Sequence, residues 1–170
     1  NDWKQTLMTN NSATESEAKI VIEPATNLGS ILFACNVNAV RSAMAEEMVK
    51  IAFKGKIFAD SCGVQPGNPD GFAIAVMEES GYDMNGHTPK SFEQLDYEFF
   101  DVIISFSPEA DAKARELTRN MDCETLYWPV DNLANLQGSR DERLRAYRAV
   151  RDDIAAKLSI YLQTEISTNA

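Results

Sequence analysis

The chain has 170 residues, of which 44% are hydrophobic, and its formal net charge at pH 7 is −10. This length and this apolar content suffice for one domain with a single sizeable core. The negative charge argues against nonspecific binding to nucleic acid or to an anionic membrane, because both need basic patches. No apolar run approaches the roughly 20 residues that a membrane span requires. We therefore expect neither nucleic acid nor a membrane as a partner.

Residues 1–29 are predicted to form a polar, flexible extension, although Ile20, Val21 and Ile22 could dock on the domain as a short strand. The extension contains no hydrophobic stretch of the kind found in a secretory signal. The three cysteines stand at scattered positions and do not resemble a disulfide framework. These features predict a cytoplasmic location.

Apolar runs and helical patterns alternate along the rest of the chain. Four apolar runs predict strands at residues 31–34, 57–59, 102–106 and 126–130. Four periodic segments predict helices near residues 42–54, 69–80, 108–119 and 139–162. Such alternation is typical of βαβ units, so we expect an α/β fold with a parallel sheet. Residues 30–163 would form this domain, and residues 164–170 a polar tail.

The segment from Cys35 to Arg41 has the spacing C-x5-R and joins the first predicted strand to the first predicted helix. A strand, a tight loop and a helix start predict an oxyanion site, because backbone N–H groups turn inward and the helix terminus adds positive charge. Arg41 can bind two oxygens with its planar guanidinium. The same field favours the thiolate of Cys35, a nucleophile. The residues predicted to bind the substrate are Asn36, Val37, Asn38, Ala39, Val40 and Ser42.

The residues around the loop carry this prediction, since the spacing alone arises by chance in roughly one such chain in seven. Asn38 tolerates left-handed backbone angles and is expected to hold the loop geometry. Ser42 supplies a hydroxyl that can donate to the sulfur of Cys35. The alternative is that Cys35 is a small buried residue at a strand end and that Arg41 is solvated.

Four segments follow one another in the order of a known family, at residues 31–48, 60–63, 81–87 and 100–105. Together they resemble the low-molecular-weight protein tyrosine phosphatase superfamily, which also contains one class of arsenate reductases. The resemblance extends from about Ser30 to about Leu162. It implies a three-layer fold with an open four-stranded parallel sheet of order 2-1-3-4 and helices on both faces. It also implies phosphomonoester hydrolysis through a cysteinyl-phosphate.

In the resembling phosphatases, an Asp-Pro pair after the last strand protonates the leaving group and then activates water. Here Asp131 is the only carboxylate in the corresponding loop, and no proline follows it. We expect Asp131 to be this general acid and base. Alignment on Trp128 would instead place Asn132 at the acid position, and a third possibility is that Asp131 only caps the turn.

The substrate is less well defined than the loop. Phosphotyrosine-directed members of the family usually carry aromatic residues just after the acid, where this chain has Leu133 and Ala134. Phe72, Tyr127 and Trp128 could supply an aromatic wall, but the last two lie in a strand run and are expected to belong partly to the core. A phosphotyrosine protein is thus implied by the family resemblance only.

Two other functions remain open. In an arsenate reductase Cys35 would attack arsenate and a second thiol would resolve the adduct. The cysteine pair of the thioredoxin-coupled reductases is missing, because only Cys123 lies in the second half of the chain, so the thiol would be external. The other alternative is a catalytically impaired module that binds phosphate or another tetrahedral oxyanion.

Four further predictions concern Cys62, His87, metal or cofactor binding, and the arginines of the last helix. Cys62 follows a strand expected to neighbour that of Cys35, so a protective disulfide between them is a hypothesis. His87, the only histidine, is expected to be a structural hydrogen-bonding group. No cluster has the spacing of metal ligands, and we predict neither metal nor cofactor. The last predicted helix carries arginines that are expected to form a solvated face, at positions 140, 143, 145, 148 and 151.

Overall fold

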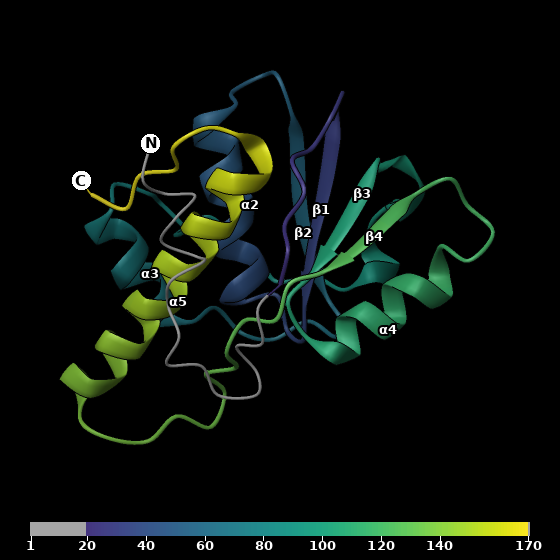
Figure 1. Ribbon diagram of the computed structural model, residues 1–170. Helices are drawn as coiled ribbons and strands as arrows, with labels where there is room; N and C mark the ends of the chain where they lie inside the picture. Colours follow the sequence, from purple (N-terminus) through teal and green to yellow (C-terminus); the bar gives the residue numbers. More distant parts are fainter. Residues whose placement is uncertain (1–19, 170) are drawn as a thin grey trace.

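The computed structural model describes residues 20–169 and shows a four-stranded parallel sheet of order β2-β1-β3-β4 (Figure 1). The strands are β1 (Ser30–Cys35), β2 (Phe58–Gly63), β3 (Val102–Ser105) and β4 (Glu124–Tyr127). The α-helices are α2 (Arg41–Ala52), α3 (Gly71–Glu79), α4 (Pro108–Leu117) and α5 (Arg140–Leu162), and two 3-10 helices are η2 (Phe92–Gln94) and η3 (Tyr97–Phe99). The predicted α/β fold and its strand order are confirmed. Residues 1–19, most of the predicted flexible extension, lie outside the described residues.

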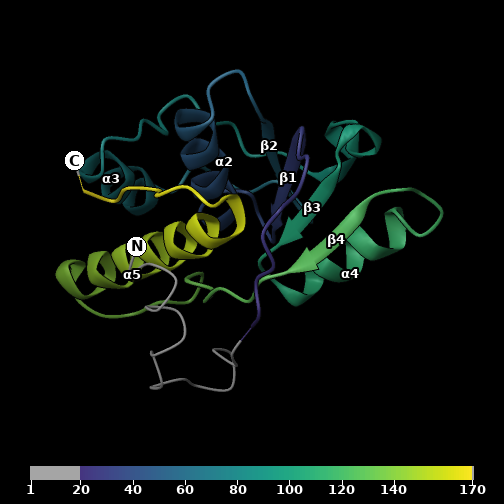
Figure 2. The ribbon, with the colours of Figure 1, turned by 45° about the horizontal axis from the view of Figure 1, so that its top comes forward.

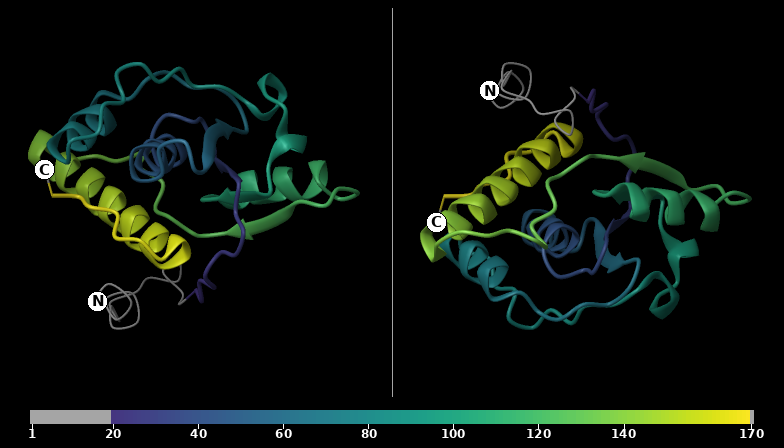
Figure 3. Two further views of the ribbon diagram at one scale, coloured as in Figure 1. Left: turned by 90° about the horizontal axis from the view of Figure 1, so that it is seen from above. Right: turned by 90° about the horizontal axis from the view of Figure 1, so that it is seen from below.

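The helices cover both faces of the sheet (Figures 2 and 3). Ile31 and Phe33 of β1 pack in a core shared with α2, α3 and α5, whereas Leu32 and Ala34 pack in a second core shared with α4. Because both faces of β1 are buried, its sequence is a continuous apolar run rather than an alternating one. Among the described helices, none is long and apolar enough to cross a membrane.

The strand register brings four loops to one edge of the sheet. Cys35 at the end of β1 pairs with Gly63 at the end of β2, and Ala34 pairs with Ser105 at the end of β3. Ser105 in turn pairs with Tyr127, the last residue of β4. Parallel strands thus deliver the segments that follow them to a common place, where open α/β sheets bind ligands.

Two strands end three or more residues away from their predicted ends. The strand β4 ends at Tyr127 rather than at Val130, although Trp128 and Val130 still donate N–H bonds to the carbonyls of Ser105 and Phe106. Pro129 has no N–H, so the regular ladder stops before it. The strand β2 continues to Gly63 instead of ending at residue 59, because its polar second half still pairs along β1.

Residues 20–29 dock on the domain without forming the strand that was predicted at residues 20–22. Ile20 and Ile22 pack against the main core, while Val21 between them is 84% exposed. The N–H of Ala25 donates to the carbonyl of Tyr161 in α5 at 2.8 Å. This segment is therefore held by side-chain packing and by a backbone hydrogen bond rather than by a sheet ladder.

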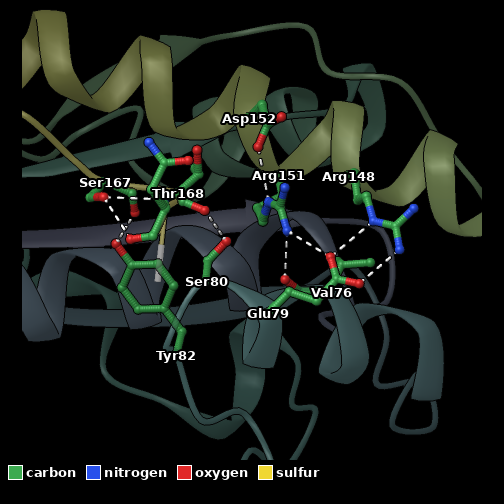
Figure 4. A network of polar contacts seen from close by, with 10 residues as sticks. Val76, Glu79, Ser80, Tyr82, Arg148, Arg151, Asp152, Ser167 and Thr168 are labelled. Atoms are coloured by element: carbon green, nitrogen blue, oxygen red, sulfur yellow. Dashed lines mark hydrogen bonds and ion pairs between the residues drawn. The ribbon is translucent and has the colours of Figure 1, made fainter.

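The predicted polar tail after residue 163 packs against the domain (Figure 4). The hydroxyls of Tyr82 and Ser80 donate to the carbonyls of Ser167 and Thr168, each at 2.6 Å. Ile166 between the end of α5 and these contacts is only 6% exposed. Figure 2 shows the resulting path, in which the tail runs back from the end of α5 to α3.

One arginine of α5 contradicts the prediction of a solvated face. Arg151 is only 7% exposed, and its Nη1 donates to the carbonyl of Val76 at 2.8 Å and to Glu79 at 3.2 Å (Figure 4). It lies four residues after Tyr147 and three before Ile154, so it occupies the apolar stripe of the helix. Its charge is accommodated there because the last turn of α3 supplies acceptors.

We expect Arg151→Leu to lower the free energy of unfolding by about 1–3 kcal/mol, because it leaves the buried carbonyl of Val76 without its donor. Urea denaturation would measure this change. Arg145→Leu is the matched control, because Arg145 is exposed on the same helix and should change stability by no more than about 0.5 kcal/mol. Equal losses in the two variants would contradict the assigned role of Arg151.

Candidate active site

Asn38 determines the shape of the loop between β1 and α2. It is fully buried and has φ of 58°, in the left-handed region that asparagine tolerates, as the sequence predicted. Its Nδ2 donates to the hydroxyls of Ser42 and Ser61, both at 2.8 Å. Its Oδ1 accepts from the backbone N–H of Lys90 at 3.0 Å. The Nε2 of His87 lies 2.7 Å from the carbonyl oxygen of Asn38, which confirms the structural role expected of this histidine.

The thiol of Cys35 faces a hydroxyl at the start of α2. Its Sγ lies 2.9 Å from the Oγ of Ser42, and Cys35 is 2% exposed. Because Ser42 accepts from Asn38, its own proton is available either to the carbonyl of Cys62, at 3.3 Å, or to the sulfur. A thiolate can only accept, so the hydroxyl would then turn its proton toward Cys35.

Unpaired backbone donors surround this thiol. Within residues 20–169, the N–H groups of residues 37–40 donate to no protein acceptor. The helix α2 that follows has no side-chain cap at Val40 and no acidic residue in its first turn. A helix start without a cap leaves orphan N–H groups and partial positive charge, both of which favour an anion. The loop therefore has the donors that its sequence predicted.

Arg41 is buried and oriented by the neighbouring strands. It is 6% exposed, so the alternative of a solvated first-turn arginine is wrong. Its Nη1 donates to the carbonyl of Phe106, after β3, at 3.1 Å and to that of Val130, after β4, at 3.2 Å. Both bonds use the same nitrogen, which leaves the edge formed by Nε and Nη2 for two oxygens of a ligand.

An open pocket of about 360 Å³ lies beside this arginine. Its lining residues are Asn36, Arg41, Phe106, Ser107, Pro108, Glu109, Tyr127, Pro129, Val130, Asp131 and Asn132. Tyr127 contributes to the wall, because β4 is an edge strand that leaves its side chain half-buried. Trp128 is 3% exposed and belongs to the core, as expected.

Asp131 and Asn132 both line this pocket, and their side chains differ in what they bind. The Oδ1 of Asn132 accepts from the N–H of Ala134 at 3.0 Å, which is an Asx turn. The carboxylate of Asp131 is exposed, and within residues 20–169 it forms no hydrogen bond or ion pair. The turn-capping role considered for Asp131 therefore belongs to Asn132.

A second pocket, of about 510 Å³, lies behind the loop and has a different character. Its wall carries charges of both signs, in which Lys50 pairs with Glu46 and Lys90 pairs with Asp60, and it also includes Glu47, Asp83 and His87. Burial raises the pKa of Glu47 above its usual value. Glu46 accepts from the hydroxyl of Ser61, which holds Asn38, so this pocket supports the loop from its far side.

The hypothesis of a disulfide between Cys35 and Cys62 is wrong in this structure. Cys35 packs in the core beneath α2, whereas Cys62 packs in the core on the opposite face of the sheet. Cys35, Cys62 and Cys123 are all free thiols. Burial raises the pKa of Cys62 far above its ordinary value, so this thiol stays protonated at neutral pH.

Three residues at the site were missed by the sequence analysis. Ser107 donates from Oγ to the Oδ1 of Asn36 at 2.6 Å and also caps α4, and its Ser-Pro sequence was a usable signal for that cap. Ser61 and Lys90 both bind Asn38. Lys90 contributes only its backbone N–H, so no side-chain pattern could have indicated it.

These features define a class of protein: a parallel α/β domain in which a cysteine and an arginine stand at the two ends of the loop after the first strand. The family model described as low molecular weight phosphotyrosine protein phosphatase matches residues 30–169. The chain therefore belongs to this family of cysteine-dependent enzymes, and the resemblance found in the sequence is confirmed.

Curated relatives of the chain are named arsenate reductases. It is 40% identical over 75 residues to the glutaredoxin arsenate reductase of Synechocystis, an alignment that covers 44% of this chain and 57% of that protein. It is 29% identical over 132 residues to arsenate reductase 1 of Staphylococcus epidermidis, covering 78% of this chain and 94% of the relative.

Solved structures of both enzyme types share the fold. An arsenate reductase in the phosphate binding state has a TM-score of 0.62 and 28% identity, over 78% of this chain and 94% of its own. A tyrosine phosphatase of Erwinia amylovora has a TM-score of 0.64 over 83% of this chain and 96% of its own, and at 20% identity it shows the fold alone. The phosphate state of the reductase supports oxyanion binding by this family.

Gly63 tests how the loop is supported. A Cβ at this position would lie 2.8 Å from both the carbonyl oxygen of Asn36 and the N–H nitrogen of Asn38. We expect Gly63→Ala to destabilise the fold by about 1–3 kcal/mol and to weaken phosphate binding, because the loop must shift. Thermal unfolding with and without phosphate measures both effects. The control is Gly86→Ala, whose Cβ would meet no atom within 4 Å; similar behaviour of the two variants would contradict this account.

Proposed function

We propose that the protein is a phosphomonoester hydrolase that works through a cysteinyl-phosphate intermediate. The observation that carries this proposal is the combination found in one loop: the thiol of Cys35, the unpaired N–H groups of residues 37–40, and the free edge of Arg41. This set can bind three oxygens of a phosphoryl group while leaving the sulfur beneath the phosphorus. Electrostatic groups fixed in advance are the main source of transition-state stabilisation in such sites.

In the first step the Cys35 thiolate attacks phosphorus, the S–P bond forms, and the bond to the leaving oxygen breaks. Arg41 and the loop amides stabilise the charge on the equatorial oxygens. Asp131 gives its proton to the leaving oxygen. In the second step Asp131, now a carboxylate, takes a proton from water as this water attacks phosphorus. The S–P bond breaks, and Cys35 leaves as a thiolate that accepts a hydrogen bond from the hydroxyl of Ser42.

The choice of Asp131 over Asn132 as the acid rests on their side chains. An amide cannot donate a proton to a leaving alkoxide, and the oxygen of Asn132 is occupied by the N–H of Ala134. The Asp131 carboxylate lines the same pocket as Arg41. The departure from the family's Asp-Pro pair therefore shifts the proposed acid by one residue instead of removing it.

Reduction of arsenate by an external thiol is the second candidate, and the names of the curated relatives favour it. Cys35 would form a bond to arsenic(V) with loss of water. A thiol would then attack the sulfur, so that a mixed disulfide forms, the S–As electron pair passes to arsenic, and arsenous acid leaves with the thiol proton. The resolving thiol would be external, because Cys62 lies on the other face of the sheet and Cys123 lies at the opposite end of β4.

The substrate and the compartment follow from the same proposal. A phosphotyrosine protein is the candidate substrate because of the family, and the half-buried ring of Tyr127 supplies one apolar wall of the pocket. Three free thiols support a reducing, cytoplasmic location. If the protein fails the activity assays, the remaining function is a module that binds oxyanions without turnover.

The proposed activity predicts turnover of para-nitrophenyl phosphate that vanadate inhibits. Cys35→Ser should abolish this turnover but retain phosphate binding, because the amides and Arg41 remain. Arg41→Lys should also lose most activity, since a point charge cannot reproduce a two-pronged guanidinium edge. Thiol-dependent reduction of arsenate without ester hydrolysis would establish the second candidate instead. Phosphate binding with neither reaction would identify an impaired module.

The acid assignment predicts a dependence on the leaving group. We expect Asp131→Asn to slow hydrolysis of phosphotyrosine by about 10²-fold or more and that of para-nitrophenyl phosphate much less, because nitrophenolate leaves without protonation. Steady-state kcat on both substrates measures this difference. If Asn132 occupies the acid position instead, the wild type is already slow on phosphotyrosine and Asn132→Asp accelerates it. Equal losses on both substrates would give Asp131 a structural role.

A further inference from the structure

Two acidic side chains lie at the mouth of the candidate active site. Arg41, Glu109 and Asp131 are the charged residues among those that line the pocket. Within residues 20–169, neither Glu109 nor Asp131 forms an ion pair. The neighbouring Asp111 differs from them, because its Oδ2 accepts from the Nε of Arg115 at 2.9 Å.

The position of Glu109 relative to the loop is fixed. It is the second residue of α4, whose cap Ser107 donates to the Oδ1 of Asn36 in the loop. Glu109 is exposed, and its charge reaches the pocket wall. Burial raises the pKa of Tyr127, the charges of Asp111 and Glu109 raise it further, and Arg41 opposes them.

The charges in the pocket are arranged in two layers. A bound dianion would be matched by the loop amides and by Arg41, whose guanidinium is buried at the base of the pocket. The groups attached to that dianion would then lie beside Asp131, which carries a proton when it acts as the acid, and beside the exposed carboxylate of Glu109, with no lining cation left to offset this charge. A negative rim attracts basic groups and repels acidic ones through the surrounding water.

We propose that Glu109 is a specificity-determining residue, whose charge selects substrates in which the phosphate is flanked by neutral or basic groups and rejects acidic ones. This inference rests on the proposed function and specifies its substrate class. Glu109 does not touch the reacting atoms in this account. It acts on the part of the substrate that projects from the pocket, so its removal should change the preference among substrates more than the chemical step.

Phosphotyrosine peptides that differ only in their flanking residues test the preference. We expect the wild type to have a higher kcat/KM for a peptide with lysines beside the phosphotyrosine than for one with glutamates. Glu109→Gln should reduce this ratio by about threefold, mainly through KM, and added salt should reduce it in the wild type as well. The control is Glu116→Gln, which removes the same charge from an exposed position on α4 outside the pocket lining.

A second measurement detects the charge of Glu109 near Cys35 without any catalytic turnover. Methanethiosulfonate reagents transfer an alkylthio group to Cys35, so that a disulfide forms while methanesulfinate leaves, and they exist in cationic and anionic forms. We expect Glu109→Gln to lower the cationic-to-anionic ratio of labelling rates at Cys35, followed by peptide mass spectrometry, by about threefold relative to Glu116→Gln. Equal ratios in the two variants, in peptides and in labelling, would overturn the inference. A shifted labelling ratio in a protein that hydrolyses no ester would instead refute the proposed function and retain the charge selection.

Discussion

The site depends on one buried asparagine held in a left-handed conformation. Asn38 uses its amide nitrogen, its amide oxygen and its backbone carbonyl to bind groups from three other parts of the chain. A side chain without this capacity would leave those buried partners unsatisfied. The left-handed backbone conformation at Asn38 also prevents the neighbouring N–H groups from forming the hydrogen bonds of a helix or a strand. These N–H groups are therefore available to an anion because several contacts together hold Asn38 in its left-handed conformation.

The strand order makes these contacts possible. Because β1 lies between β2 and β3, its carboxyl end meets the ends of both, and β4 is only one strand further. The loop is thus held on one side by Ser61 of β2, and Arg41 is held on the other by carbonyls that follow β3 and β4. All four strands, or the residues that directly follow them, thus position Arg41 and Asn38. Such support orients the donors before a ligand arrives, which is the condition for electrostatic catalysis.

The sequence predicted those features of the site that depend only on neighbouring residues. The apolar run before Cys35, the helix after Arg41 and the left-handed Asn38 were all predictable, because each follows from neighbouring residues. Contacts between distant segments were not. The burial of Arg151 depends on acceptors at the end of α3, 75 residues away in the chain, and charge patterning alone placed it in solvent.

The loop after β4 serves two tasks that the structure separates. The carbonyl of Val130 accepts a hydrogen bond from Arg41, whereas the next residue, Asp131, lines the pocket in which the proposed hydrolysis would place the leaving group. The first contact uses only backbone and is insensitive to the side chains around it. The second depends on one carboxylate and its position. Oxyanion binding can thus persist when the acid residue changes. Phosphatases must protonate an alcohol or phenol, whereas reductases pass the adduct to a thiol. The separation of the two tasks explains how both kinds of enzyme can share one architecture.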